Sequence, residues 1–308
     1  MDRFTRIFSA MLPASRQRDL DCIRQNKQTG TLYTLTLRSG PVELYCHLVD
    51  DPCAPLILEL HGGGMVLGHG LQNDAFCEAL SLRTNVHVVS VDYLEAPEHP
   101  YPAAIDQLVE LLRAVQEGRL PGVTPRKLLL LGFSGGATIA TAAALRCNTR
   151  GEGPHIDGLL LHYPFLDASI DPADKPGTAS NALPVEVARA FNQLYADEAL
   201  NGDPCVSPLL AEDELLRALP FTALFLAEDD FLCDEGKRFA QRLMELHVPV
   251  LVHLFPDVCH GYVEDCFDEA LYLGRGGIPQ GPGFEAMRRY GPQALEETAR
   301  AAALVCGM

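Results

Sequence analysis

Short apolar runs recur along the chain and alternate with segments of helical character, which gives the first indication of the fold. The runs predict buried strands at residues 55–60, 86–92, 128–131, 158–163, 221–227 and 250–255. A hairpin with period-two alternation precedes them at 31–38 and 42–49. Buried strands that alternate with helices are typical of a mostly parallel sheet with helices on both faces. We therefore predict an α/β fold with an eight-stranded sheet.

Two segments outside this alternation predict a cap. Residues 165–219 carry no strand signal and hold several prolines around one helical stretch at 185–195, so they are too long for a plain loop. At the N-terminus, apolar residues at helical spacing predict a short helix that Pro13 ends, followed by a second, more exposed helix. The expected organisation is N-terminal cap helices at 1–30, a core at 31–164 and 220–308, and an inserted helical cap at 165–219.

Composition narrows the classes of partner. The 308 residues are 47% hydrophobic and 21% charged, which is ordinary for a globular protein. The chain carries 41 acidic and 24 basic residues, a net charge of −17. This balance argues against nucleic acids and anionic membrane surfaces as partners, because both are bound through basic patches. No apolar stretch approaches the roughly 18 residues of a membrane span.

The ten cysteines are scattered and include no C-x-x-C pair, so neither a zinc site nor a redox motif is predicted. The first residues lack the uninterrupted apolar core of a signal peptide. We therefore expect a cytoplasmic protein whose cysteines stay as thiols.

The strongest local motif follows the strand at 128–131. It reads Gly132-Phe133-Ser134-Gly135-Gly136 and leads into a segment rich in helix formers. Strand, glycine-flanked serine and helix is the context in which G-x-S-x-G forms a nucleophile elbow. A side chain near Gly132 or Gly136 would clash in so tight a turn, and the helix N-terminus directs backbone N–H groups at the serine. The alternative is a glycine-rich turn without chemistry.

A nucleophilic serine needs a histidine base that a carboxylate orients, and in such a sheet both partners belong in loops after strands. Asp230 lies three residues past the strand that ends at 227, and His260 follows the strand that ends at 255. The order Ser134, Asp230, His260 is that of hydrolases with this elbow. Asp229 and Asp234 flank Asp230, and any of the three could instead cap the next helix.

A second glycine motif, His61-Gly62-Gly63-Gly64, follows the strand at 55–60. Glycines let the backbone turn its N–H groups inward without side chains filling the space. Two such groups, together with the N–H of Gly135, would make an oxyanion hole for a tetrahedral intermediate. A phosphate-binding loop is the rival, but the Lys-Ser/Thr and G-x-G-x-x-G patterns are absent. His61 is better interpreted as a brace for this loop than as a base.

With these motifs the sequence resembles the hormone-sensitive-lipase-like branch of the α/β-hydrolases, a group of carboxylesterases. The similarity runs from about residue 55 to Tyr262 and rests on motifs at 61–64, 92–104, 132–136, 207–209, 230–236 and 260–262. The resemblance implies the α/β-hydrolase fold. It selects Asp230 through the register Asp-x-Leu-x-Asp-Glu-Gly, and it implies the amides of Gly63, Gly64 and Gly135 as the oxyanion donors.

The chain departs from that family at three places. Phe133 stands before the serine where the family has an acidic residue. The stretch Tyr93-Leu94-Glu95 lacks the arginine of the family's Tyr-Arg-Leu. The tail after Tyr262 is longer than in the family, and its glycine-rich loop at 274–283 is placed where it can lie near the pocket.

We therefore expect a serine carboxylesterase for short-to-medium acyl esters, with the triad Ser134, Asp230 and His260, no metal and no organic cofactor. The expected partner is a small-molecule ester, without nucleic acid or membrane. The oligomeric state is left open, a homodimer included. An amidase or peptidase with the same triad is the alternative among enzymes. A ligand receptor on this fold is less favoured, since it requires a missing catalytic residue and none is missing here.

Overall fold

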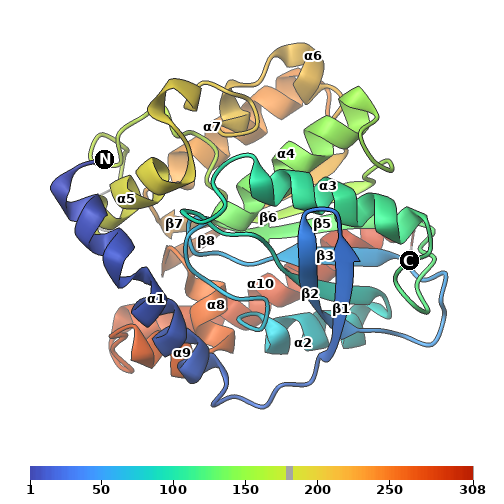
Figure 1. Ribbon diagram of the computed structural model, residues 1–308, viewed down its shortest axis with the longest axis horizontal. Helices are drawn as coiled ribbons and strands as arrows, with labels where there is room; N and C mark the ends of the chain where they lie inside the picture. Colours follow the sequence, from blue (N-terminus) through green and yellow to red (C-terminus); the bar gives the residue numbers. More distant parts are fainter. Residues whose placement is uncertain (178–182, 308) are drawn as a thin grey trace.

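The computed structural model describes residues 1–177 and 183–307 and is built around one eight-stranded sheet (Figure 1). The strand order is β1-β2-β4-β3-β5-β6-β7-β8. Strand β2 runs antiparallel to β1 and to β4, and the remaining neighbours are parallel. The strands are β1 (Thr31–Leu37), β2 (Gly40–His47), β3 (Leu56–Leu60), β4 (His87–Asp92), β5 (Leu128–Phe133), β6 (Gly158–His162), β7 (Phe221–Asp229) and β8 (Val250–Cys259).

Helices cover both faces of this sheet (Figure 1). Helices α3, α4 and α7 pack on one face, and α2, α8 and α10 pack on the other. The helices are α1 (Arg3–Ile23), α2 (Asp74–Thr84), α3 (Ala103–Gln116), α4 (Gly135–Arg150), α5 (Val185–Tyr195), α6 (Asp213–Leu216), α7 (Cys233–Glu245), α8 (Tyr262–Phe267), α9 (Glu269–Gly274) and α10 (Pro282–Cys306). Two 3₁₀ turns, η2 (Glu198–Leu200) and η3 (Pro208–Leu210), lie between α5 and α6. The predicted α/β-hydrolase fold with a mostly parallel eight-stranded sheet is confirmed.

The apolar runs explain why the central strands are buried on both sides. In β5, Leu128 and Leu130 face the α3, α4 and α7 layer, while Leu129 and Leu131 face the α2 and α10 layer. A strand alternates its side chains between the two faces, so a continuous apolar run is what a doubly covered strand requires. Strand β5 therefore has little freedom to move, and its last residue lies near the middle of the edge that the carboxyl ends of the strands form.

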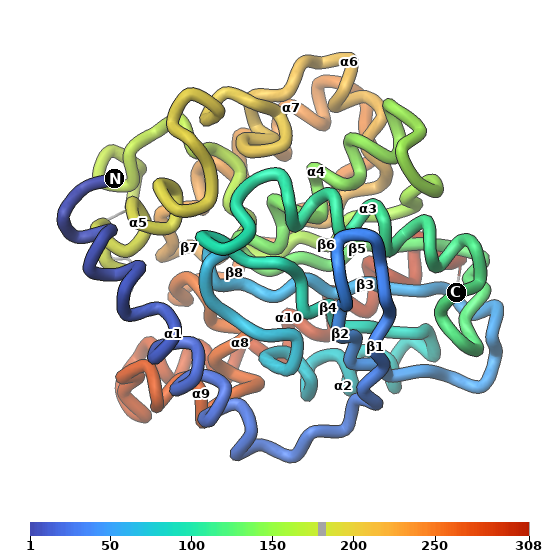
Figure 2. Tube along the Cα trace, viewed as in Figure 1, coloured from blue at the N-terminus to red at the C-terminus, as the bar shows by residue number. Residues whose placement is uncertain are grey.

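The prediction that Pro13 ends the first helix is wrong. Helix α1 runs without a break from Arg3 to Ile23 and contains Pro13. A proline inside a helix removes one hydrogen bond and costs about 3 kcal/mol. Here Leu12 and Ile23 are both buried, and α1 packs against α5 at one end and α9 at the other, as Figures 1 and 2 show. Burial of both halves offsets the proline.

The tail after His260 is largely helical. Helices α8 and α9 follow His260 directly, and α10 begins at Pro282 and contains Pro292. None of the helices in the described part of the chain is long and apolar enough to cross a membrane. All ten cysteines lie in the described part, and none forms a disulfide.

Candidate active site

Ser134 lies at the junction of β5 and α4 in a strained backbone conformation. Its φ of 51° and ψ of −116° place a residue with a side chain where L-amino acids are rarely found. The flanking glycines make this turn possible. A Cβ on Gly132 would lie 2.5 Å from the Ala137 Cα, and one on Gly136 would collide with the Leu60 carbonyl. The clash expected at both glycines is therefore present.

The structure brings Ser134, His260 and Asp230 into one hydrogen-bonded chain. The Ser134 Oγ lies 2.8 Å from His260 Nε2, and His260 Nδ1 lies 2.8 Å from Asp230 Oδ2. A carboxylate can only accept, so Nδ1 carries the proton and Nε2 accepts from the serine hydroxyl. Asp230 also accepts from the Leu232 backbone N–H at 2.9 Å, which fixes its orientation.

Of the three aspartates that sequence left open, Asp230 is the one that meets His260. Its carboxyl is buried, whereas Asp229 and Asp234 are both exposed. Burial alone would lower the pKa of His260, but the charge and hydrogen bond of Asp230, with further contributions from Glu264 and Asp265, outweigh it. The pKa of His260 is therefore raised above its usual 6.5. Such a histidine is a stronger base than a free imidazole.

The glycine loop lies directly beside the elbow. Gly63 and Gly64 both have positive φ, 116° and 64°. A Cβ on Gly135 would come within 3.1 Å of the Gly64 Cα, so the two backbones are in contact. In the described part of the chain, the N–H groups of Gly63 and Gly64 donate to no acceptor, and both residues line the same cavity as Ser134 and His260.

His61 contacts its own loop rather than Ser134. Its Nδ1 lies 2.8 Å from the Gly62 carbonyl, and its ring stacks on Tyr93 at a centroid distance of 4.2 Å. Burial lowers the pKa of His61 to about 4, so the ring is neutral at pH 7. These contacts agree with its interpretation as a brace.

Phe133, which replaces the family's acidic residue, points into the core. Its ring stacks on His162 at 4.7 Å and meets Phe76 edge-on at 5.4 Å. His162 is fully buried, and burial lowers its pKa to about 3, so this neighbour is uncharged. A carboxylate at position 133 would lose its hydration without gaining a charged partner. The apolar side chain fits this neutral environment.

A cavity of about 770 Å³ opens above Ser134 and His260. One wall comes from α5 and its neighbours, including Leu183, Val187 and Phe191. A second wall comes from α1 and the tail, including Arg18 and Arg275. The glycine-rich loop, through Gly276, Gly277, Gly281 and Gly283, lines this second wall. Its expected position near the pocket is confirmed.

Several residues of this site were not found from the sequence. The clearest is Glu264, which lies in the first turn of α8 and lines the cavity. Phe191 and Arg275 are others, because they reach the cavity only through tertiary packing. A signal for Glu264 existed in the acidic pair Glu264-Asp265 shortly after Gly261, since acidic residues favour a first helical turn.

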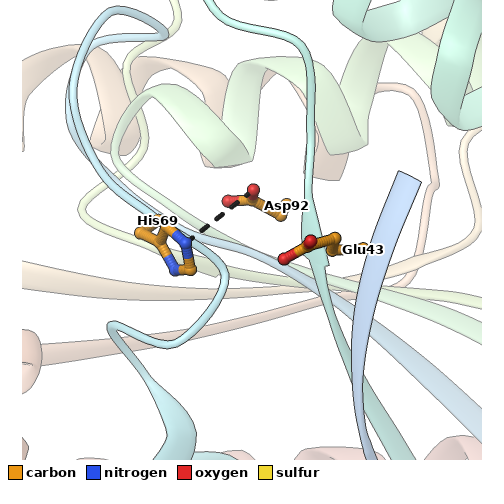
Figure 3. A group of neighbouring side chains, drawn as sticks. All are labelled: Glu43, His69 and Asp92. Atoms are coloured by element: carbon orange, nitrogen blue, oxygen red, sulfur yellow. Dashed lines mark ion pairs between the residues drawn. The ribbon is translucent and has the colours of Figure 1, made fainter. Parts of the chain in front are cut away.

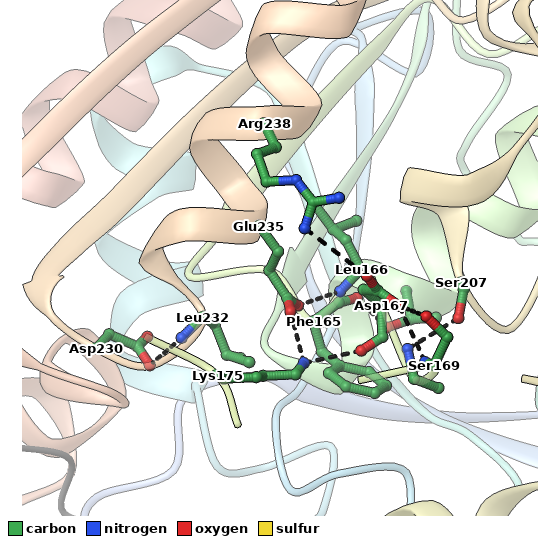
Figure 4. Close-up of polar contacts among 12 residues, drawn as sticks. Phe165, Leu166, Asp167, Ser169, Lys175, Ser207, Asp230, Leu232, Glu235 and Arg238 are labelled. Atoms are coloured by element: carbon green, nitrogen blue, oxygen red, sulfur yellow. Dashed lines mark hydrogen bonds and ion pairs between the residues drawn. The ribbon is translucent and has the colours of Figure 1, made fainter. Parts of the chain in front are cut away.

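A buried ion pair joins the segment after β6 to the helix that follows Asp230 (Figure 4). Lys175 Nζ contacts Glu235 Oε2 and donates to the Asp167 carbonyl at 2.8 Å. Glu235 also accepts from the Leu166 N–H at 2.6 Å. Lys175 and Glu235 are both buried, at 4% relative exposure each. The pair therefore attaches the start of the 165–219 segment to α7.

Among the described residues, one group has the geometry to approach a metal ion. It consists of Glu43, His69 and Asp92, which converge from β2, the loop before α2 and the end of β4 (Figure 3). Each already has a protein partner: the Tyr45 hydroxyl for Glu43, the Leu71 N–H for His69, and the Gly70 N–H for Asp92. None of the three lines the cavity over Ser134.

Comparison with known proteins is consistent with this geometry. A family model described as an alpha/beta hydrolase fold matches residues 57–264. Esterase LipI from Mycobacterium tuberculosis is 38% identical over 221 residues, which cover 70% of this chain and 67% of that protein. Carboxylesterase NlhH from the same organism is 32% identical over 253 residues, covering 81% and 78%. A solved esterase from Pyrobaculum calidifontis superimposes with a TM-score of 0.77 at 25% identity, over 100% of this chain and 94% of that one.

Proposed function

Because the chain belongs to the hormone-sensitive-lipase-like carboxylesterases of the α/β-hydrolase superfamily and is a carboxylic ester hydrolase, we propose that it hydrolyses short-to-medium acyl esters through Ser134, His260 and Asp230. The observation that carries this proposal is the unbroken chain of two 2.8 Å contacts from Asp230 through His260 to Ser134. The cavity above them gives an ester access to the serine hydroxyl.

The proposed reaction begins when Ser134 Oγ attacks the ester carbonyl carbon and passes its proton to His260 Nε2. The tetrahedral intermediate collapses, the C–O bond to the alcohol breaks, and His260 gives the proton to the leaving oxygen. Water then attacks the acyl-enzyme while His260 takes a proton from it, and Ser134 regains its hydrogen as the acid leaves. Asp230 holds the imidazole in the required tautomer and stabilises its positive charge.

In the same proposal, the N–H groups of Gly63, Gly64 and Gly135 bind the oxyanion. The contact between the Gly64 and Gly135 backbones supports this role. So does the lack of an acceptor for the Gly63 and Gly64 amides among the described residues. Donors that are already oriented toward the developing charge cost no reorganisation during the reaction.

We further propose that residues 1–30, which contain α1, and the 165–219 segment act as the cap and that 31–164 with 220–308 acts as the core. Residues 178–182 of that segment lie outside the described residues. Contacts of α1 with α5 support a cap made from both segments. The cytoplasmic location stays a prediction.

The test is Ser134→Ala, assayed with p-nitrophenyl esters from acetate to palmitate. We expect turnover to fall by about 10⁶-fold, because the nucleophile acts as a unit with its base. The wild-type protein should prefer the shorter chains, and a serine-directed phosphonate should form a stable adduct at Ser134. Full turnover by Ser134→Ala would refute the proposal. Ester and anilide substrates with one acyl group separate an esterase from an amidase.

A further inference from the structure

Glu264 connects the histidine loop to the glycine loop. It lies four residues after His260, in the first turn of α8, and is 7% exposed. Its Oε1 accepts from the Gly62 backbone N–H at 3.0 Å and from Gln72 Nε2 at 2.6 Å. Its Oε2 accepts from the Tyr163 hydroxyl at 3.3 Å. One buried carboxylate is therefore in contact with both ends of the loop between β3 and α2 and with Tyr163, directly after β6.

The contact with Gly62 acts on the proposed oxyanion donors. Gly62 and Gly63 share a peptide unit, whose N–H belongs to Gly63 and whose carbonyl accepts from His61 Nδ1 at 2.8 Å. Glu264 holds the preceding N–H, that of Gly62 itself. Because the N–H and the carbonyl of Gly62 are both hydrogen-bonded, the peptide unit between Gly62 and Gly63 resists a rotation that would turn the Gly63 N–H away from Ser134.

The presence of glycine at position 62 supports this contact. Gly63 and Gly64 have positive φ, which favours glycine, but Gly62 does not. A Cβ on Gly62 would instead lie 2.8 Å from both carboxylate oxygens of Glu264. Such a distance is shorter than a Cβ tolerates, so a side chain here would displace the carboxylate. The glycine makes room for Glu264 rather than for an unusual backbone conformation.

We propose that Glu264 is a positioning residue that keeps the oxyanion loop aligned with Ser134 through the Gly62 amide. The inference rests on the proposed function, since it concerns the same reaction. Glu264 does not touch the reacting atoms. It acts through the loop, so its loss reduces stabilisation of the transition state more than binding of the ground state.

The test compares Glu264→Ala with Glu264→Gln. The alanine variant should lower kcat by about 10²-fold with little change in KM, because a displacement of about 1 Å at such a site has an effect of that size. It should slow phosphonate labelling of Ser134 to a similar degree. The glutamine variant keeps an acceptor for the Gly62 N–H and should restore most of kcat.

Asp74→Ala is the matched control. Asp74 is also a buried carboxylate that accepts from two backbone amides, those of Thr29 and Gly30, but it lies outside the cavity. Its loss should lower the melting temperature while kcat of the folded protein stays within about twofold. A merely structural Glu264 would behave in the same way, without rescue by glutamine, and that result would overturn the inference.

A second variant covers the case in which Glu264→Ala fails to fold. Gly62→Ala pushes the carboxylate away and should lower kcat while Glu264 is present. Where both single variants fold, the double variant should be no slower than the slower single one, because both changes break the same contact. An unchanged kcat in Gly62→Ala would overturn the inference. If that result is found while Ser134→Ala abolishes turnover, the inference about Glu264 fails but the proposed function still stands.

Discussion

The floor of the cavity, formed by the Ser134, Asp230 and His260 chain and the glycine loop, is built differently from its wall, formed by α1, α5 and the C-terminal tail. On the floor, Ser134, His260 and the glycine loop directly follow β5, β8 and β3, and Asp230 follows β7. These strands belong to the parallel run β3-β5-β6-β7-β8, whose carboxyl ends meet at one edge of the sheet. Each of these residues therefore directly follows a strand that holds it in place. Positions of this kind are encoded locally, in a few residues of sequence.

The wall is placed instead by contacts between distant parts of the chain. Helix α1 joins α5 to α9, and Phe8 of α1 meets Phe191 of α5 edge-on at 5.8 Å. Arg16 of α1 donates to the Val66 carbonyl at 2.9 Å and to the Ala96 carbonyl at 2.6 Å. It thereby attaches the wall to the chain just beyond the glycine loop. No local sequence pattern near these positions predicts such a contact.

Arg16 also bears on the arginine that is missing after Tyr93. Leu94 stands in its place, and Arg16 pairs with the adjacent Glu95 at 3.2 Å and with Glu98 at 2.9 Å. A guanidinium therefore reaches this segment from the N-terminal helix. The sheet therefore holds the proposed catalytic residues, whereas the shape of the pocket depends on how α1, α5 and the C-terminal tail meet.

After loss of Ser134 itself, the largest effect should come from changing Asp230 on the floor. Asp230→Asn should lower kcat by about 10⁴-fold, because the amide no longer holds His260 in the right tautomer. Substrate KM should change far less, since the wall is untouched. Steady-state kinetics with p-nitrophenyl acetate measures both. Asp229→Asn, at the exposed neighbour, is the control and should keep wild-type kcat.

The pH profile gives the same experiment a second readout. His260 must be neutral to accept the serine proton, so kcat/KM falls as pH drops through its pKa. In the wild type that midpoint should lie above 6.5, because Asp230, together with Glu264 and Asp265, raises the pKa of His260. Residual activity of Asp230→Asn should show a lower midpoint. Equal midpoints would mean that Asp230 does not set the basicity of His260.

The next effect concerns the joint between wall and floor, the Lys175–Glu235 pair. Lys175→Met leaves Glu235 buried without its cation, and breaking a buried pair in this way costs about 3–5 kcal/mol. Burial, opposed by Lys175, raises the pKa of Glu235 to about 7, and removal of Lys175 raises this pKa further. The variant therefore avoids part of the loss wherever Glu235 takes up a proton. Urea unfolding should show a larger loss of stability at pH 8 than at pH 5.

Arg189→Met is the matched control for this prediction. Arg189 belongs to α5 and pairs with Asp171 at 2.7 Å, but both side chains are more than a third exposed. An exposed pair is worth about 0–1 kcal/mol, so its loss should scarcely change the unfolding midpoint. Equal destabilisation by the two variants would show that burial of Lys175 does not matter to the attachment of the wall.

The same division explains what the sequence could predict. The strands and Ser134, His260, Gly63 and Gly64 were accessible because an apolar run followed by a short motif is sufficient to place each of them. Asp230 could be separated from Asp229 and Asp234 only through a family resemblance, since all three carry the same carboxyl group. Burial distinguishes them, and burial is a property of the folded chain.

What could not be predicted depends on contacts across the whole chain. Glu264 meets Gly62 across 202 positions, and Arg275 pairs with Asp19 across 256. Pro13 led to the prediction of a helix end because the free-energy cost of an internal proline arises within the helix itself. The packing of α1 that offsets this cost comes from residues far away in the sequence. Local sequence patterns therefore predicted the residues of the floor but not those of the wall.

The smallest expected effect is a change of substrate range from altering the wall alone. The ring of Phe191 lies so close to Gly64 that a Cβ there would overlap it, so this ring limits the cavity immediately beside the glycine loop. Phe191→Ala should open that space and favour a longer substrate by about tenfold in kcat/KM, the effect of roughly one methylene in an apolar pocket. One series of p-nitrophenyl esters varies the acyl chain, and one series of acetates varies the alcohol.

The two series identify which part of the ester Phe191 faces, because only one of them should change. Arg189→Ala, on the same helix but outside the cavity, should leave both profiles unchanged. Phosphonate labelling of Ser134 in Phe191→Ala should keep its wild-type rate if the wall selects substrates without taking part in the chemistry. A labelling rate that falls together with the change in range would instead mean that Phe191 also holds Gly64 in place, and the floor and the wall would then no longer be separable at this residue.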